Sequence, residues 1–144
     1  MEKFIKSRTN GYLLKNRYYE VQEIYIMENK IKELKEFMAD EKQKTQSRID
    51  SLIADDREDE ARAYRAALNI YDVFTSLIDV PYKQVAGDER GFIDGFKKLS
   101  VNVPAQWRNS LSKAKEHDDA EKIMIEEAKL KVADSIIEKF DELF

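Results

Sequence analysis

The stretch "VQEIYIMENKIKELKEFM", residues 21–38, decides the fold that we expect for this chain. Its apolar residues follow one another in steps of three and four: Val21, Ile24, Met27, Ile31, Leu34 and Met38. Side chains at this spacing lie on one side of an α-helix, in the manner of the a and d positions of a coiled coil. The stretch therefore predicts a helix that packs against another helix.

The neighbouring sequence makes this predicted helix long. No glycine or proline occurs from Tyr12 to Val80, and Asn10-Gly11 is a turn signal at which the helix can begin. We expect one helix over about residues 12–54. At about 1.5 Å per residue it would exceed ~60 Å, which is longer than a compact domain of this size. Part of it must project or pair with another chain.

A second helix is predicted over about residues 57–79. Asp55 or Asp56 can cap its start, and the acidic residues that follow suit the positive end of the helix dipole. Pro81 is expected to end it, because the residue before a proline avoids the α region. Its apolar face consists of Tyr64, Leu68, Tyr71, Phe74, Leu77 and Ile78.

The C-terminal part of the sequence predicts shorter helices. We expect one over 88–99, a break before Pro104, and a last helix over about 119–143. The predicted fold is all-α, a long antiparallel helical hairpin with a smaller C-terminal helical segment packed on it. Residues 1–80 hold a basic segment and the hairpin, and residues 81–144 hold the C-terminal segment, with one shared core expected.

The stretch "GDERGFIDGF", residues 87–96, holds three of the four glycines of the chain. Gly87 suits the loop before the third helix, with Asp88 as its cap. Gly91 and Gly95 fall on one helical face, where each costs roughly 1 kcal/mol relative to alanine. They indicate either a close approach of this helix to the hairpin or a weak helix that rearranges when a partner binds.

Composition excludes several classes of protein. The chain of 144 residues has no cysteine, so disulfides and cysteine-ligated metal sites are excluded. It shows no signal-peptide pattern and no apolar run of about 18 residues, so we expect a cytoplasmic protein without a membrane partner. The 38 % of charged residues are typical of long exposed helices.

The sequence offers little for catalysis, and we expect no enzyme, no cofactor and no catalytic or metal-binding residue. His117 is the only histidine, and no nucleophile elbow or phosphate-binding loop is present. Carboxylates three residues apart, above all Glu33 and Glu36, could hold magnesium in a metal-dependent all-α nucleotide hydrolase, which is the second alternative function. The other such pairs are Glu20/Glu23, Asp55/Glu58 and Asp56/Asp59.

The N-terminus is the best candidate for binding nucleic acid, which is the first alternative function. Residues 1–17 carry five basic residues and one acidic residue, a net charge of +4. Cations among tyrosines can bind phosphates while the bases stack. The heptad spacing of Tyr12/Tyr19 and Tyr18/Tyr25 instead favours packing. The candidate residues are Lys6, Arg8, Tyr12, Lys15, Arg17, Tyr18 and Tyr19.

Two acidic segments, 50–60 and 116–127, each carry six acidic residues and one basic residue, a net charge of −5. Such segments on rigid helices can imitate nucleic acid and occupy the groove of another protein. A solvated surface with capping residues explains them as well.

The function that the sequence favours is non-catalytic protein binding or assembly. The first partner expected is a second copy of the chain, and the second is a different protein. In composition the chain resembles small accessory proteins of phages and bacterial mobile elements, which implies a modulator or inhibitor of a larger host machine. The predicted interface residues are Met27, Ile31, Leu34, Met38, Phe140 and Phe144.

Overall fold

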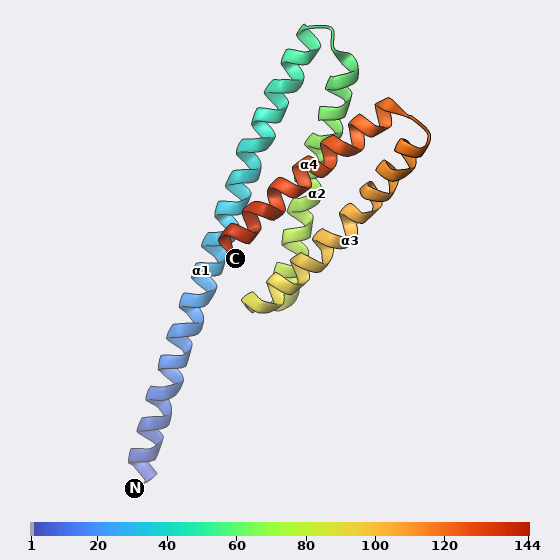
Figure 1. Ribbon diagram of the computed structural model, residues 1–144. Helices are drawn as coiled ribbons and strands as arrows, with labels where there is room; N and C mark the ends of the chain where they lie inside the picture. The colour runs from blue at the N-terminus through green and yellow to red at the C-terminus, as the bar shows by residue number, and fades with distance from the viewer. Residues whose placement is uncertain (1) are drawn as a thin grey trace.

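The chain forms four α-helices, α1 (Glu2–Ala54), α2 (Glu58–Val85), α3 (Glu89–Glu116) and α4 (Ala120–Leu143) (Figure 1). The structure is a computed structural model that describes the backbone of residues 2–144 and the side chains of residues 16–144. Residues 2–144 contain no β-strand. The all-α prediction is therefore confirmed.

The helices are joined by short turns and fold back on one another (Figure 1). α2 runs antiparallel to α1, α4 crosses over α2, and α3 packs beside α4 and against the end of α2. The C-terminus lies beside the middle of α1 (Figure 1). The first half of α1 extends alone beyond the other helices, so the molecule consists of a helical body and one projecting helix.

The turns that end α1 and α3 satisfy the helix ends in the same way. Asp56 and Asp118 have φ values of 57° and 51°, in the left-handed region that aspartate tolerates better than most residues. The amide that follows each of them donates back to a carbonyl five residues earlier, at 2.9 Å in both turns. This is a Schellman arrangement, which pairs carbonyls that the helix leaves unsatisfied.

The two prolines lie inside helices, contrary to the sequence-based expectation. Pro81 lies within α2, which continues to Val85, and Pro104 lies within α3, so the predicted break does not exist. Both prolines are buried. A helix interior loses one hydrogen bond at a proline. Here tertiary packing outweighs that local cost, so α3 is one long helix and not two short ones.

The start of α1 and the cap of α2 also differ from prediction. The helix begins at Glu2 and passes through Asn10 and Gly11 without a turn. A single glycine costs a helix about 1 kcal/mol, which a helix of 53 residues can absorb. The N-cap of α2 is Arg57, with no side-chain capping bond. Asp56 adopts the left-handed turn instead of capping.

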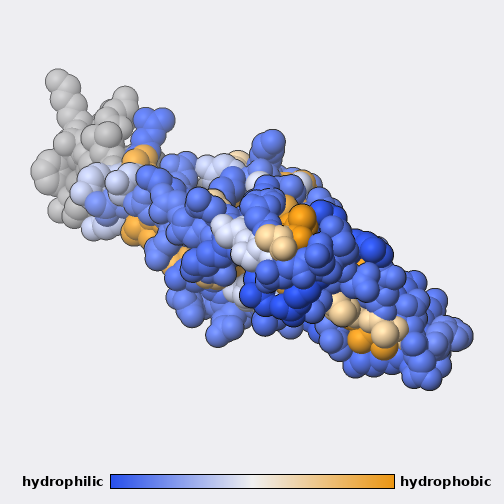
Figure 2. Space-filling view, turned by 90° about the horizontal axis from the view of Figure 1, so that it is seen from above, coloured by the Kyte–Doolittle hydropathy of each residue, from blue (hydrophilic) through white to orange (hydrophobic). Residues whose placement is uncertain are grey.

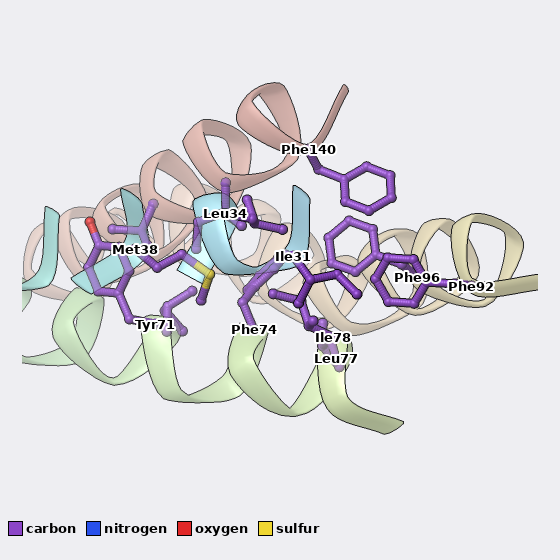
Figure 3. Packing of buried hydrophobic residues seen from close by; sticks show 14 of the residues in the cluster. Ile31, Leu34, Met38, Tyr71, Phe74, Leu77, Ile78, Phe92, Phe96 and Phe140 are labelled. Carbon is purple, nitrogen blue, oxygen red and sulfur yellow. The ribbon is translucent and has the colours of Figure 1, made fainter. Parts of the chain in front are cut away.

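The core draws on all four helices and on both predicted segments, 1–80 and 81–144 (Figure 3). Its centre is aromatic: the rings of Phe96 and Phe140 stack with centroids 4.0 Å apart, and the ring of Phe74 meets Phe96 edge-on. α1 supplies Ile31, Leu34 and Met38 to the same cluster (Figure 3). One continuous core therefore holds the body together.

Ion pairs tie α1 to its neighbours around this core. The ammonium groups of Lys30, Lys35 and Lys42 lie 2.9, 2.6 and 2.9 Å from carboxylate oxygens of Glu89, Asp79 and Asp72. Exposed pairs of this kind contribute about 0.2–1 kcal/mol each. They fix the register of α1 against α2 and α3 more than they stabilise the fold.

Candidate protein-binding surface

The first part of α1 leaves the body at a definite point. Met27 is the first buried residue of the helix among side chains 16–144, with none of its surface exposed. One turn earlier, Ile24 is half-buried against Gly87, where an added Cβ would lie 3.0 Å from its Cδ1 atom. We call residues 2–26 the arm and residues 27–144 the body.

The described part of the arm exposes large apolar and aromatic side chains. Val21 is 63 % exposed and Tyr25 is 65 % exposed, although both lie on a regular helix. Figure 2 shows a mostly hydrophilic surface with only small hydrophobic areas, some of them near the arm. A group of exposed apolar side chains on such a surface indicates an interaction site. Among residues 16–26, the exposed large apolar and aromatic side chains are Tyr18, Tyr19, Val21, Tyr25 and Ile26.

Three of these residues form a row that we call the exposed stripe: Tyr18, Val21 and Tyr25. Their steps of three and four residues place them on one side of the helix. At about 100° per residue, this row lies roughly 145° around the helix from the buried row that begins at Met27. The exposed stripe therefore points away from the core.

The exposed stripe continues along α1 into a groove between α1 and α2. The same steps of three and four lead from Tyr25 to Glu28, Lys32 and Lys35. The hydroxyl of Tyr82 donates to Glu28 Oε1 at 2.8 Å across this groove, and that bond is the main cause that raises the pKa of Tyr82. The groove is lined by Glu28, Ile31, Lys32, Lys35, Glu36, Ala39, Asp79, Tyr82 and Lys83.

Charge changes sign along the arm. Residues 1–17 have a net charge of +4, whereas residues 18–29 contain Glu20, Glu23 and Glu28 and no basic residue, a net charge of −3. The side chain of Arg17 is exposed at the boundary between the two segments. The charge of the sequence that carries the exposed stripe therefore changes from basic to acidic after residue 17.

The residues that were predicted to form an interface lie elsewhere. Met27, Ile31, Leu34 and Met38 are buried in the core of the body, where α2 and α4 cover them. These four side chains pack within one chain, because the buried row of α1 is long enough to pack against α2. The exposed stripe thus replaces them as the candidate surface.

The two C-terminal phenylalanines of that prediction also pack within the chain. Phe140 is 1 % exposed and stacks on Phe96. Phe144 is partly buried. The centroid of its ring lies 4.6 Å from that of Phe140 and 5.2 Å from the ammonium nitrogen of Lys30. Neither ring is free for a partner in this structure.

The nucleic-acid candidates fall into two groups. Lys6, Arg8, Tyr12 and Lys15 lie outside the residues whose side chains the structure describes. Arg17, Tyr18 and Tyr19 are exposed on the arm, and the rings of the two tyrosines meet edge-on with centroids 6.0 Å apart. These tyrosines do not pack into the hairpin, so the packing role that their heptad spacing favoured is not seen.

The carboxylate pairs do not converge on a metal site. Glu33 and Glu36 are exposed, and Glu36 lies 3.9 Å from Lys32. The pairs Glu20/Glu23, Asp55/Glu58 and Asp56/Asp59 are exposed as well. Among side chains 16–144, no three histidine, aspartate or glutamate residues come together in a geometry that could hold a metal ion. His117 is the exposed C-cap of α3.

The turns that carry the two acidic segments both lie away from the arm (Figure 1). Arg62 on α2 bonds to Asp59, at 3.4 Å, and also to Glu121 on α4. Arg57 binds Glu60 through two nitrogens, at 3.0 and 2.7 Å to the same carboxylate oxygen. The arginines thus partly neutralise the carboxylates, and Glu126 is buried beside Lys129.

Within the part of the chain that the structure describes, no helix is both long enough and apolar enough to cross a membrane. Comparison of the chain with protein-family models, with curated proteins and with solved structures found no match.

Proposed function

We propose that the protein is a non-catalytic protein-binding or assembly protein, and that its binding element is the arm of α1. The observation that carries the proposal is the exposed stripe on a regular helix that extends beyond the body. Large apolar side chains at a spacing of three and four residues are the form in which one helix binds another helix or a groove. Their exposure costs free energy that a partner can recover.

The body supplies a rigid support for this element. All four helices contribute to its core, and every buried side-chain polar atom among residues 16–144 has a hydrogen-bond partner. The arm is one continuous helix with α1 of the body, so the body sets its direction. A rigid helix loses less conformational entropy on binding than a flexible segment does.

A photo-crosslinking experiment in the native host tests the proposal. A photoreactive phenylalanine analogue replaces Val21 in the exposed stripe, and a matched variant carries it at Val101, which is 68 % exposed on α3. We expect protein adducts at position 21 and few at position 101. The mass of the adduct distinguishes a second copy from a subunit of a larger machine. Absence of any adduct specific to position 21 would refute the proposal.

Nucleic-acid binding is the second candidate function, because Arg17, Tyr18 and Tyr19 are exposed together on the arm. The net charge of +4 over residues 1–17 supplies the attraction to phosphate that such binding needs. Exposed tyrosine rings can stack on unpaired bases. Because exposed rings stack on unpaired bases, this candidate favours a single-stranded partner.

Fluorescence anisotropy with a labelled single-stranded oligonucleotide tests this candidate. Binding at low salt should weaken as salt rises, and it should weaken further when Lys15 and Arg17 are replaced by alanine. A matched control replaces two exposed basic residues of the body, Lys97 and Lys98. Equal loss in both pairs would indicate non-specific attraction, and no binding at low salt would remove the candidate.

A further inference from the structure

We infer that the arm binds a second copy of this chain, with the two α1 helices antiparallel and crossing at the exposed stripe. The inference rests on the proposed function and adds the identity and direction of the partner. In this arrangement Tyr18 of one chain faces Tyr25 of the other, and Val21 lies at the centre. Each chain then covers the stripe of its partner with the same residues, as a two-fold interface requires.

The charge of the arm selects the antiparallel direction. Two parallel arms would place both segments 1–17, each with a net charge of +4, side by side, whereas the acidic residues within 18–25 of the two chains face one another in either direction. Like charges at such distances repel. Antiparallel arms separate the two basic segments to opposite ends of the pair. Each basic segment then lies beyond the acidic segment of its partner.

One contact across the pair follows from helix geometry. Arg17 and Glu28 are 11 residues apart in the sequence, so they lie about 20° apart around the helix, on the same flank of the exposed stripe. With Tyr18 opposite the partner's Tyr25, Arg17 lies about two residues, or ~3 Å along the axis, from the partner's Glu28. An arginine side chain can span that offset.

The groove between α1 and α2 gives the partner's arm a place beyond the stripe. Glu28 and Lys32, which continue the exposed stripe, line the groove together with Ile31 and Ala39. The groove lies between α1 and α2, and residues of both helices line it. The partner's arm can therefore extend along the groove in contact with both helices.

The oligomeric state is the first test. Sedimentation equilibrium of the whole chain should give about twice the monomer mass of 16.9 kDa. Replacing Val21 and Tyr25 by glutamate should weaken the dimer at least 100-fold, and the matched variant Val101→Glu should leave it unchanged. Circular dichroism should show that all three proteins are folded, because every replaced side chain is exposed. A monomeric wild type would overturn the inference.

Disulfide trapping tests the direction, and the chain has no cysteine of its own to interfere. An equimolar mixture of the variants Tyr18→Cys and Tyr25→Cys should form mixed disulfide dimers under mild oxidation, whereas either variant alone should form few. Efficient dimers of Tyr18→Cys alone would indicate parallel helices and overturn the inference.

Failure of the inference and failure of the proposed function are distinguishable. A monomer whose position 21 still gives adducts with another protein in the host would exclude the second copy as partner and leave the proposed function standing. A monomer that gives no adduct specific to position 21 would refute both.

Discussion

Gly95 on α3 lies directly against Pro81 on α2, so closely that a Cβ atom at Gly95 would be 2.8 Å from Cβ of the proline. Real side chains do not approach to that distance. The absence of a side chain at Gly95 thus allows α3 to pack against the proline that α2 carries in its last turns. Close approach of this helix to α2, one of the two interpretations of the glycine pattern, is what the structure shows.

Replacing Gly95 by alanine should therefore destabilise the body. Alanine favours the helix by about 1 kcal/mol over glycine. Forcing a methyl group against a rigid proline ring in a packed site costs about 1–3 kcal/mol, so we expect a net loss of up to ~2 kcal/mol. Urea unfolding monitored by circular dichroism measures it.

Gly91→Ala is the matched control. A Cβ there would lie 3.0 Å from Oδ2 of Asp88 and 3.0 Å from Cγ1 of Val85. The Asp88 side chain is exposed and can move aside, but the half-buried Val85 must shift, which offsets the gain of about 1 kcal/mol in helix propensity. We therefore expect a net change within about 0.5 kcal/mol. A Gly95→Ala protein more stable than the wild type would show that the approach to Pro81 is not tight.

Two residues of α1, Leu34 and Val21, should give opposite results when each is replaced by alanine. Leu34 is fully buried, so its loss should cost about 2–5 kcal/mol of unfolding free energy. Val21 is 63 % exposed, so its loss should cost less than about 0.5 kcal/mol. Association of the chain should weaken with Val21→Ala. Urea unfolding measures the stability of both variants, and sedimentation measures their association. An equal loss of unfolding free energy in the two variants would contradict the prediction.

The sequence predicted the helices more accurately than their ends. The steps of three and four residues in 21–38 predicted α1 because helical periodicity is a local property of the chain. The turn near residues 55–57 was placed correctly although its predicted cap, Asp55 or Asp56, was wrong, and the last helix was expected from about residue 119, which is the observed N-cap of α4. Pro81 and Pro104 were misleading, since their positions inside helices depend on neighbours that are distant in the sequence.

The candidate surface was harder to find from the sequence. Val21 continues the steps of three that lead to Met27, but two successive steps of three turn it away from the buried row. The pattern also cannot tell where along the helix the body begins, and the turn between α2 and α3, with Gly87 against Ile24, reaches no earlier than Ile24 among the described residues, so that residues 16–23 are exposed. The heptad pair Tyr18/Tyr25 was noticed and was interpreted as packing within the chain.

The N-caps of α3 and α4 offer a matched pair of aspartates. The carboxylate of Asp119 accepts a hydrogen bond from the amide of Lys122 at 3.2 Å, whereas Asp88 makes no side-chain capping bond. Asp119→Ala should therefore cost about 0.5–2 kcal/mol, and Asp88→Ala should cost clearly less. Thermal unfolding of both variants measures the difference. An equal loss would mean that attraction to the helix dipole, and not the hydrogen bond, stabilises both ends.

Stability should fall at alkaline pH because of Tyr71. This side chain is 4 % exposed, and burial raises the pKa of its phenol above the usual value of 10.0, although a hydrogen bond with Thr45 opposes the shift. The folded state then holds the proton more tightly than the unfolded state. This contribution is complete below about pH 10 and is lost as pH rises through the folded pKa.

Tyr71→Phe removes the titrating group and should reduce that loss. We expect the unfolding free energy of the wild type to fall, as pH rises above about 10, by more than that of Tyr71→Phe. Tyr82→Phe should act in the same direction, because the bond from its hydroxyl to Glu28 is the main cause that raises the pKa of Tyr82. Tyr19→Phe, at a side chain that is 58 % exposed, is the control and should keep the wild-type decline. A decline that is identical in Tyr71→Phe and the wild type would show that the buried phenol does not set the alkaline limit.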